Sequence, residues 1–408
     1  MYTRSVGWHF RLLAVAVLIP GLAAAQPSPW DAAIDAGKTA YEQGLYEEAE
    51  KQFKAALLEA EGFELKDPRL ATTLDQLISV YRTDGKLVFA EPYYHRLLGI
   101  QEGTWGPLDP RLVTVLNGLG TLYTATRQWD QAESVYQRAL GIREKALGGE
   151  HPDVAATLES LAALAAVQAK FDNAEAYYIR ALGVRERTQG VDHLSIAATL
   201  DGLAGMYRDQ GKYAAAEPLF RRALAIREKA HGPDHPELVP SLDNLAWTCY
   251  AQRKYAEAEP LYGRSLFIWE KTVGPDHPTV ATALDNLAGV YVAREKFAKA
   301  EPLYQRALLI REKALLANYD KLASAYVGEK KYAQAEQLYQ RALAIAERSV
   351  LPDRVQIGMV LERYGELLKM LNRKEEAARM FARVRQIKEH LAQEAAAPAP
   401  KPGEKREP

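Results

Sequence analysis

The feature that most constrains the fold is a repeat of about 42 residues that runs through almost the whole chain. The dipeptide Ala-Glu marks the repeat, and successive copies lie 41, 42, 42, 42, 42, 42 and 35 residues apart. The copies begin at Ala49, Ala90, Ala132, Ala174, Ala216, Ala258, Ala300 and Ala335, and a degenerate ninth follows at Ala377. A fixed period of this length indicates one supersecondary unit per repeat, stacked into a long array rather than folded as separate globular domains.

Each repeat carries the pattern of two helices. An aromatic residue follows the anchor by four positions and a mostly small residue by seven, as in Ala216, Phe220 and Ala223. Spacings of i, i+4 and i+7 lie on one helical face. An earlier segment of the repeat places Leu, Leu and Tyr at i, i+3 and i+7, as in Leu200, Leu203 and Tyr207. Between repeats the chain reads Gly-Pro-Asp-His-Pro, as at 232–236, where Gly ends one helix and Pro starts the next.

Three blocks carry a resemblance to a known family. They are Leu-Asp-Asn-Leu-Ala at 284–288, Tyr-Ala-Glu-Ala-Glu-Pro-Leu-Tyr at 255–262 and Arg-Ala-Leu-Ala-Ile-Arg-Glu-Lys at 222–229. The units resemble tetratricopeptide repeats in the 42-residue form of kinesin light chains and many exported bacterial proteins. The resemblance implies an all-α fold, a right-handed α-solenoid of about nine helical hairpins whose first helices line a concave groove.

The two ends of the chain differ from the repeats. Residues 1–25 have Arg4 and Arg11, an apolar run and Ala23-Ala24-Ala25, which is the layout of a cleaved secretory signal. The alternative is an uncleaved anchor, although the run is short for a membrane span. We therefore expect an exported chain, periplasmic rather than released to the medium. The solenoid is predicted for residues 26–392 and a disordered tail rich in Pro, Ala and charge for 393–408.

One step of the repeat is irregular. The interval of 35 residues falls between the anchors Ala300 and Ala335, and residues 314–320 lack the Gly-Pro-Asp-His-Pro turn. We expect shorter helices and a local change of curvature there. The ninth unit is more polar than the others, as is typical of a terminal unit that covers the last apolar face of a solenoid.

Composition excludes several classes of protein. The 408 residues hold 52 Lys and Arg against 53 Asp and Glu, with 48% hydrophobic residues. This balance argues against a disordered acidic chain and against a nucleic-acid partner. Apart from the N-terminal run, no stretch is apolar enough for a transmembrane segment. The single cysteine, Cys249, permits no internal disulfide and is predicted to be a buried apolar residue.

Catalytic and cofactor motifs are missing from the sequence. We find no phosphate-binding loop, zinc-protease motif or nucleophile elbow, so we expect no enzyme, no cofactor and no metal. Histidines recur at 42-residue spacing, at His151, His193, His235 and His277. Successive units stand about 10 Å apart, too far for two such histidines to share a metal ion. The column is therefore interpreted as turn chemistry.

Two charged columns follow the repeat on the second helices. Glu recurs at Glu61, Glu102, Glu144, Glu186, Glu228, Glu270, Glu312, Glu347 and Glu389, and Arg at Arg96, Arg138, Arg180, Arg222, Arg264, Arg306, Arg341 and Arg383. Such columns indicate a solvated face or ion pairs between units. Trp269 interrupts another column that is otherwise mostly Arg and could mark a contact.

The first helices carry the columns that vary. By the resemblance, the groove should be lined by Gln76, Gly118, Ser160, Gly202, Asn244, Asn286, Lys321 and Arg363. Beside them runs a column that we call the acidic column: Asp75, Asn117, Glu159, Asp201, Asp243, Asp285, Asp320 and Glu362. A free acidic column would favour a basic or polar ligand. The alternative is that an Arg or Lys of the adjacent unit neutralises each carboxylate.

One patch stands out as a candidate peptide-binding site. It comprises Asp243, Asn244, Trp247, Tyr250, Asp285 and Asn286. An amide both donates and accepts hydrogen bonds, as main-chain recognition requires, and aromatic side chains beside it are typical of a binding hot spot. The leading hypothesis is a non-enzymatic exported adaptor that binds a peptide or protein segment in its groove. The alternative is an architectural or self-associating envelope protein without a defined peptide site.

Overall fold

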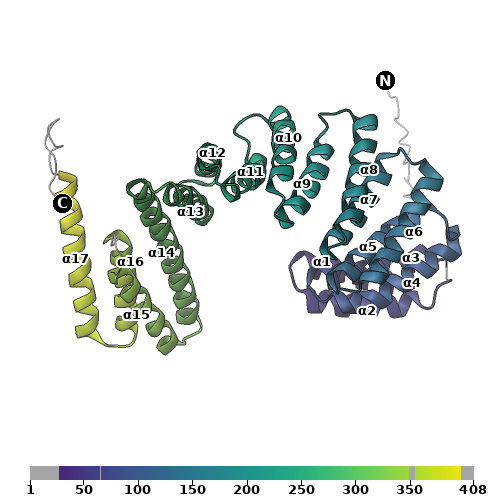
Figure 1. The fold of residues 1–408 in the computed structure, drawn as a ribbon. Helices are drawn as coiled ribbons and strands as arrows, with labels where there is room; N and C mark the ends of the chain where they lie inside the picture. The colour runs from purple at the N-terminus through teal and green to yellow at the C-terminus, as the bar shows by residue number, and fades with distance from the viewer. Residues whose placement is uncertain (1–26, 65, 349–353, 397–408) are drawn as a thin grey trace, which may run out of the picture. The chain divides into compact units, whose positions relative to one another are not determined.

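The computed structural model describes residues 27–64, 66–348 and 354–396. Within these ranges the chain is all-α, with seventeen α-helices, two short 3-10 helices and no strand (Figure 1). The chain divides into two compact units, Met1–Gly148 and Gly149–Pro408. The all-α prediction is confirmed, and the predicted signal segment, residues 1–25, lies outside the described residues.

The first unit contains three helical hairpins. The hairpins are α1 (Pro29–Glu42) with α2 (Tyr46–Ala60), α3 (Pro68–Thr83) with α4 (Leu87–Trp105), and α5 (Val113–Ala125) with α6 (Trp129–Leu147). The short helix η1 (Pro110–Leu112) leads into α5. Each hairpin also packs on the next, through α2 with α3 and α4 with α5, so the unit is a solenoid of stacked pairs.

The second unit is built from hairpins of the same kind. It begins with α7 (Pro152–Val167), α8 (Phe171–Gln189), α9 (Leu194–Asp209) and α10 (Tyr213–His231), followed by η2 (Pro236–Leu238), α11 (Val239–Ala251) and α12 (Tyr255–Val273). It ends with α13 (Pro278–Ala293), α14 (Phe297–Gly328), α15 (Tyr332–Arg348), α16 (Arg354–Met370) and α17 (Lys374–Ala396). The second helix of each hairpin packs on the first helix of the following one, as α10 does on α11.

The turns between hairpins follow from their sequence. Gly232 ends α10 with φ of 86°, a left-handed conformation that glycine adopts without strain. The histidine of each such turn caps the start of the next helix, since the Nδ1 atom of His151, His193, His235 and His277 accepts a hydrogen bond from the backbone N–H two residues later. The interpretation of the histidine column as turn chemistry is confirmed.

The irregular step gives a longer helix, not shorter ones, so that expectation was wrong. α14 is one continuous helix of 32 residues, which joins the second helix of one repeat to the first helix of the next (Figure 1). The place that corresponds to Gly274, 42 residues later, is the buried Leu316. Without glycine, proline or a capping histidine, nothing interrupts the backbone hydrogen bonds, and the chain stays helical.

The C-terminal boundary also differs slightly from the prediction. Helix α17 extends to Ala396, four residues past the boundary placed at residue 392. The remainder of the predicted tail, residues 397–408, lies outside the described residues. No helix in the part of the chain that the structure describes combines the length and apolarity needed to cross a membrane.

The core is built from the repeating columns. The anchor alanines are buried, and so are most of the aromatic rings four residues later, as Ala216 and Phe220 show; Tyr304 is the exposed exception and Phe381 is partly buried. Cys249 is a free, buried cysteine in the cluster around α11 and α12, and burial raises the pKa of its thiol to about 11. The thiol therefore stays protonated at neutral pH and packs as an apolar side chain, as predicted.

Candidate functional site

Helix α11 carries the candidate site. Asp243, Trp247 and Tyr250 stand at i, i+4 and i+7, so they share one face of this helix. The opposite face holds buried residues such as Leu242, Leu245 and Cys249, which fixes the orientation of α11 against the core. Asp285 and Asn286 occupy the corresponding places on α13, in the next hairpin.

The acidic column is largely ion-paired. Glu159 binds Arg185 through two hydrogen bonds of 2.8 and 2.7 Å, and Asp201 Oδ2 lies 2.5 Å from Arg227 Nη2. Three further members of the column are paired: Asp285 with Arg311, Glu362 with Lys388 and Asp320 with Arg363. The alternative in which basic residues neutralise the column therefore holds for most of it.

The pairing geometry differs from the one expected. In four of the five pairs the cation stands 26 residues after the acid, on the second helix of the same hairpin, as Arg227 on α10 stands to Asp201 on α9. The expected partner was a residue of the adjacent unit, and only Asp320 follows that expectation, with Arg363 on α16. Two antiparallel helices of a hairpin bring residues at this separation side by side, which the period of 42 does not reveal.

Asp243 lacks the partner that its neighbours have. The residue 26 positions later is Trp269, where the hairpins on either side have Arg227 and Arg311. Arg227 also donates a hydrogen bond of 2.6 Å to Ser241 Oγ, and the residue that corresponds to Ser241 in the next repeat is the buried Ala283. A cation and its acceptor have thus been replaced together by two apolar side chains, while the carboxylate has stayed.

The electrostatics of Asp243 reflect this loss. The Oδ1 atom is buried and makes no hydrogen bond to a described residue in both Asp243 and Asp201, but Asp201 is paired with Arg227 through Oδ2, and Asp243 has no cation partner among the described residues. Burial raises the pKa of Asp243, and only an interaction with Ser265 opposes the rise. Burial also raises the pKa of Asp201, but there Arg227 opposes it. Asp243 is therefore a partly desolvated carboxylate without a positive partner, which favours the approach of a cation.

Asp75 is the other carboxylate of the acidic column that makes no ion pair among the described residues, and it differs in its surroundings. The residue 26 positions later is Gln101, and burial raises the pKa of Asp75. The places four and seven residues after Asp75 hold Ser79 and Arg82. An unpaired carboxylate next to exposed aromatic rings is therefore found at Asp243 and not at Asp75.

Trp247 and Tyr250 are exposed although they are large and apolar. Their exposed fractions are 43% and 36%. Trp247 packs edge-on against Tyr213, with 5.6 Å between the ring centroids, and the Arg208 guanidinium lies 5.9 Å from its ring. Tyr250 lies 5.3 Å from Tyr255, measured between ring centroids. These contacts hold both rings in place while leaving much of their surface accessible.

Two members of the predicted groove-lining column, Gly202 and Asn244, contact the preceding hairpin, which the resemblance does not imply. Asn244 Oδ1 accepts a hydrogen bond of 3.0 Å from Arg208 on α9, while its Nδ2 atom makes no hydrogen bond to a described residue. A Cβ atom at Gly202, the corresponding residue of α9, would lie 2.7 Å from the ring of Tyr178. The Asn286 side chain makes no hydrogen bond within the described part of the chain.

The charged columns of the second helices form ion pairs between units, one of the two interpretations offered by the sequence. The pairs join consecutive second helices at a separation of about 36 residues: Arg96 with Glu61, Arg138 with Glu102, Arg222 with Glu186, Arg264 with Glu228, Arg306 with Glu270, and Arg383 with Glu347. Their regularity marks them as part of the scaffold rather than a binding site.

The sequence contained a signal for the unpaired carboxylate. Trp269 interrupts a column of arginines, and Asp243 belongs to a column of acids, both visible at the 42-residue period. Only the spacing of 26 residues between the two columns connects them, and that spacing comes from the hairpin geometry. Sequence reasoning therefore singled out both residues without linking them.

Comparison with known proteins assigns the family. The tetratricopeptide repeat model matches residues 69–145, 111–187, 153–229, 195–266, 251–313 and 314–390. The chain belongs to the tetratricopeptide repeat family, as the resemblance predicted, and repeats of this kind indicate a protein–protein interaction scaffold. No curated protein sequence matches the chain.

Several solved structures are similar to parts of the chain. Nearly identical TPR-like repeats of a candidate kinesin light chain from Podosopora anserina are 24% identical, with a TM-score of 0.46, over 50% of this chain and 97% of that one. BtubC (BKLC) from P. vanneervenii is 23% identical, with a TM-score of 0.46, over 60% and 91%. Aspartyl phosphate phosphatase F from Bacillus subtilis is 14% identical, with a TM-score of 0.45, over 89% and 94%. At these values the likenesses carry no argument about function.

Proposed function

We propose that this chain is a non-enzymatic adaptor that binds an extended peptide or protein segment on the face of α11, and that the segment presents a lysine or arginine to Asp243. The single observation that carries the proposal is the unpaired Asp243 carboxylate, in a column whose other carboxylates are mostly neutralised by a cation. The family supports the general role of an interaction scaffold.

The charge of Asp243 supports a basic ligand. An ammonium or guanidinium group near Oδ2 would supply the interaction that Arg227 supplies to Asp201. A cation within about 4 Å of a carboxylate lowers its pKa and removes the cost of keeping an unpaired charge partly desolvated. Binding of a neutral or acidic segment would leave that cost in place. Asp243 therefore favours a basic side chain over other types at this position of the ligand.

The neighbours of Asp243 supply the remaining elements of peptide recognition. Trp247 and Tyr250 offer rigid, exposed apolar surface one and two helical turns away, and aromatic residues of this kind dominate binding energies at interfaces. Asn244 Nδ2 has no partner among the described residues and can donate to a ligand carbonyl, while Oδ1 is held by Arg208. The Asn286 amide, on α13, can both donate and accept.

A selection from a random peptide library tests this function. The purified chain serves as bait, with Asp243→Asn and Trp269→Arg as parallel baits. The Trp269→Arg variant restores the arginine that pairs with the carboxylate in the neighbouring hairpins. We expect the parent to enrich peptides with lysine or arginine at one constant position, and both variants to lose at least about tenfold in affinity for them. The matched control is Asp201→Asn, which alters a carboxylate already paired with Arg227 and should retain most of the binding.

Two results would contradict the proposal. One is enrichment of peptides without a basic residue, bound equally by the parent and by both variants. The other is no enriched peptide at all, together with concentration-dependent self-association in sedimentation experiments, which would favour the architectural alternative.

We also propose that the adaptor acts outside the cytoplasm, in the periplasm. The support is the sequence of residues 1–25, a charged start, an apolar run and three alanines. Cell fractionation with N-terminal sequencing tests this: the chain recovered from the periplasm should begin at Gln26. Recovery in the cytoplasm with residues 1–25 intact would contradict it.

A further inference from the structure

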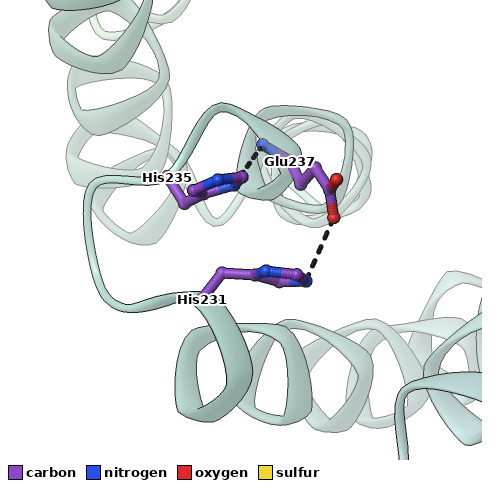
Figure 2. Close-up of side chains that lie close together, drawn as sticks. All are labelled: His231, His235 and Glu237. Carbon is purple, nitrogen blue, oxygen red and sulfur yellow. Dashed lines mark hydrogen bonds and ion pairs between the residues drawn. The ribbon is translucent and has the colours of Figure 1, made fainter.

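We propose that the turn between α10 and α11 binds a divalent cation of the Zn²⁺ type through His231, His235 and Glu237. Figure 2 shows the three side chains on one side of the turn, with the two imidazole rings stacked and the Glu237 carboxylate beside His231. One ligand atom from each residue lies within 4.8 Å of the other two. Two imidazoles and one carboxylate form a donor set that zinc commonly takes, with water in the fourth position.

The geometry of the cluster needs only small movements to close around an ion. His231 Nε2 lies 3.0 Å from Glu237 Oε2, and the rings of His231 and His235 are 4.8 Å apart at their centroids with an interplanar angle of 22°. Tetrahedral ligands at about 2.0–2.1 Å from zinc are about 3.3 Å from one another. His235 and Glu237 are exposed, so their side chains can make up the difference without disturbing the core.

The other turns of the same type serve as internal comparisons. Each places a histidine at the position of His235, but the positions of His231 and Glu237 differ from turn to turn. They hold Leu147 and Asp153 in one turn, Gln189 and Ser195 in the second, and Val273 and Thr279 in the third. The repeat alone requires only the capping histidine. Asp153 also supplies a carboxylate in its turn, but only this one of the four turns combines the capping histidine and a carboxylate with a second histidine, which completes a three-ligand set.

The charged residues around the turn leave the Glu237 carboxylate available to coordinate a metal ion. Asp234, in the same turn, lies 3.0 Å from Lys271, and the corresponding Asp192 is likewise paired with Lys229. Glu237 has no lysine or arginine partner among the described residues, and its carboxylate faces only His231. A divalent ion bound between His231 Nε2 and Glu237 Oε2 would neutralise the carboxylate.

The capping role of His235 limits the affinity. Its Nδ1 atom accepts a hydrogen bond of 3.3 Å from the backbone N–H of Glu237. Coordination by a neutral imidazole requires the other ring nitrogen to carry the proton, so binding through either nitrogen gives up this hydrogen bond. The loss of an N-cap interaction weakens binding by roughly fivefold. We therefore expect micromolar rather than nanomolar affinity for zinc.

Calorimetric titration of the purified, untagged chain with Zn²⁺ tests the site. We expect one ion per chain and a melting temperature that rises with zinc concentration, because the ion binds only the folded turn. His231→Leu and Glu237→Thr install residues that sibling turns already have, so both variants should fold. Each should weaken zinc binding by at least about tenfold, since each removes a ligand.

The control is His277→Asn, which changes the capping histidine of a turn that lacks the other two ligands, and asparagine is itself a good N-cap. This variant should bind zinc as the parent does. Three results would overturn the assignment: zinc binding unchanged in His231→Leu, a loss of binding in His277→Asn as large as in His231→Leu, or no binding by the parent at a 100-fold excess of zinc over about 10 μM protein.

Discussion

The hairpins α9–α10 and α11–α12 are built on the same 42-residue pattern, yet they treat the same carboxylate differently. In the first, Asp201 is paired with Arg227, which also reaches Ser241 on the following helix. In the second, Asp243 faces a place where Trp269 and Ala283 have replaced the arginine and the hydroxyl. The difference shows that a repeat protein can leave a carboxylate without its internal partner, and the proposed binding position rests on that loss rather than on an added motif.

The two hairpins differ again at the next position of their first helices. Helix α9 has Gly202 and Gly205 where α11 has Asn244 and Trp247. On α9, Gly202 is closely packed against Tyr178 and Gly205 has open space beside it, while α11 presents an amide and an exposed ring at these positions. Asn244 and Trp247 lie within one turn of α11 and next to Asp243, which is why we propose the site there.

The largest expected effect is the loss of the internal ion pair in α9–α10. Arg227→Ala leaves Asp201 without its cation and Ser241 without its donor, so it should destabilise this hairpin by about 2 kcal/mol. Hydrogen exchange of the α9 and α10 amides measures this locally, which suits a repeat array whose unfolding need not be cooperative. A change below about 0.5 kcal/mol would show that the pair is only a surface interaction.

The next largest effect on stability is expected for a substitution at Gly202, the residue of α9 that corresponds to Asn244. Gly202→Asn would bring a side chain onto α9 that matches Asn244, but its Cβ would lie 2.7 Å from the Tyr178 ring. Overpacking should cost about 1.5 kcal/mol, again read from exchange in α9. An unchanged stability of α9 would mean that the Tyr178 ring moves aside easily and that this position of the solenoid can accept an asparagine.

The smallest expected effect is a gain of stability rather than a loss. Asp243→Asn removes an unpaired, partly desolvated charge, so α11 should become more stable at pH 7 by about 1 kcal/mol. Burial raises the pKa of Asp243, so the folded state binds its proton more tightly than the unfolded state. The parent therefore loses stability as the pH rises from the unfolded-state pKa of Asp243 through its higher folded-state pKa. The gain of the variant should therefore vanish below about pH 4. A loss of stability at pH 7 would reveal a cationic partner that the structure lacks.

Much of the fold was predictable because the period repeats the same local chemistry. Helix ends follow from residues such as Gly232 and His235, and the core from the alanine and aromatic columns. The expectation of shorter helices at α14 was wrong because a shorter interval does not end a helix when the terminating glycine, proline and capping histidine are missing. Loss of the glycine at the place of Leu316 was the informative change.

The candidate site was only partly predictable. The residues of the patch could be chosen from their departures from the columns, but the state of each carboxylate depends on a contact between two helices. The separation of 26 residues that brings Arg227 to Asp201 depends on hairpin register, which a single sequence does not specify. The cluster at His231 was missed for a related reason, since only histidines at the 42-residue spacing were compared.

The most direct test of the account is a double-mutant cycle between Asp243 and the basic residue of a selected peptide. Binding would be measured for the parent and Asp243→Asn, each with the peptide and with its lysine or arginine changed to glutamine. A coupling energy of at least about 1.5 kcal/mol is predicted, with a value near zero when Asp201→Asn replaces Asp243→Asn in the same cycle. No coupling at Asp243, or equal coupling at both aspartates, would contradict the claim that the missing arginine creates the binding position.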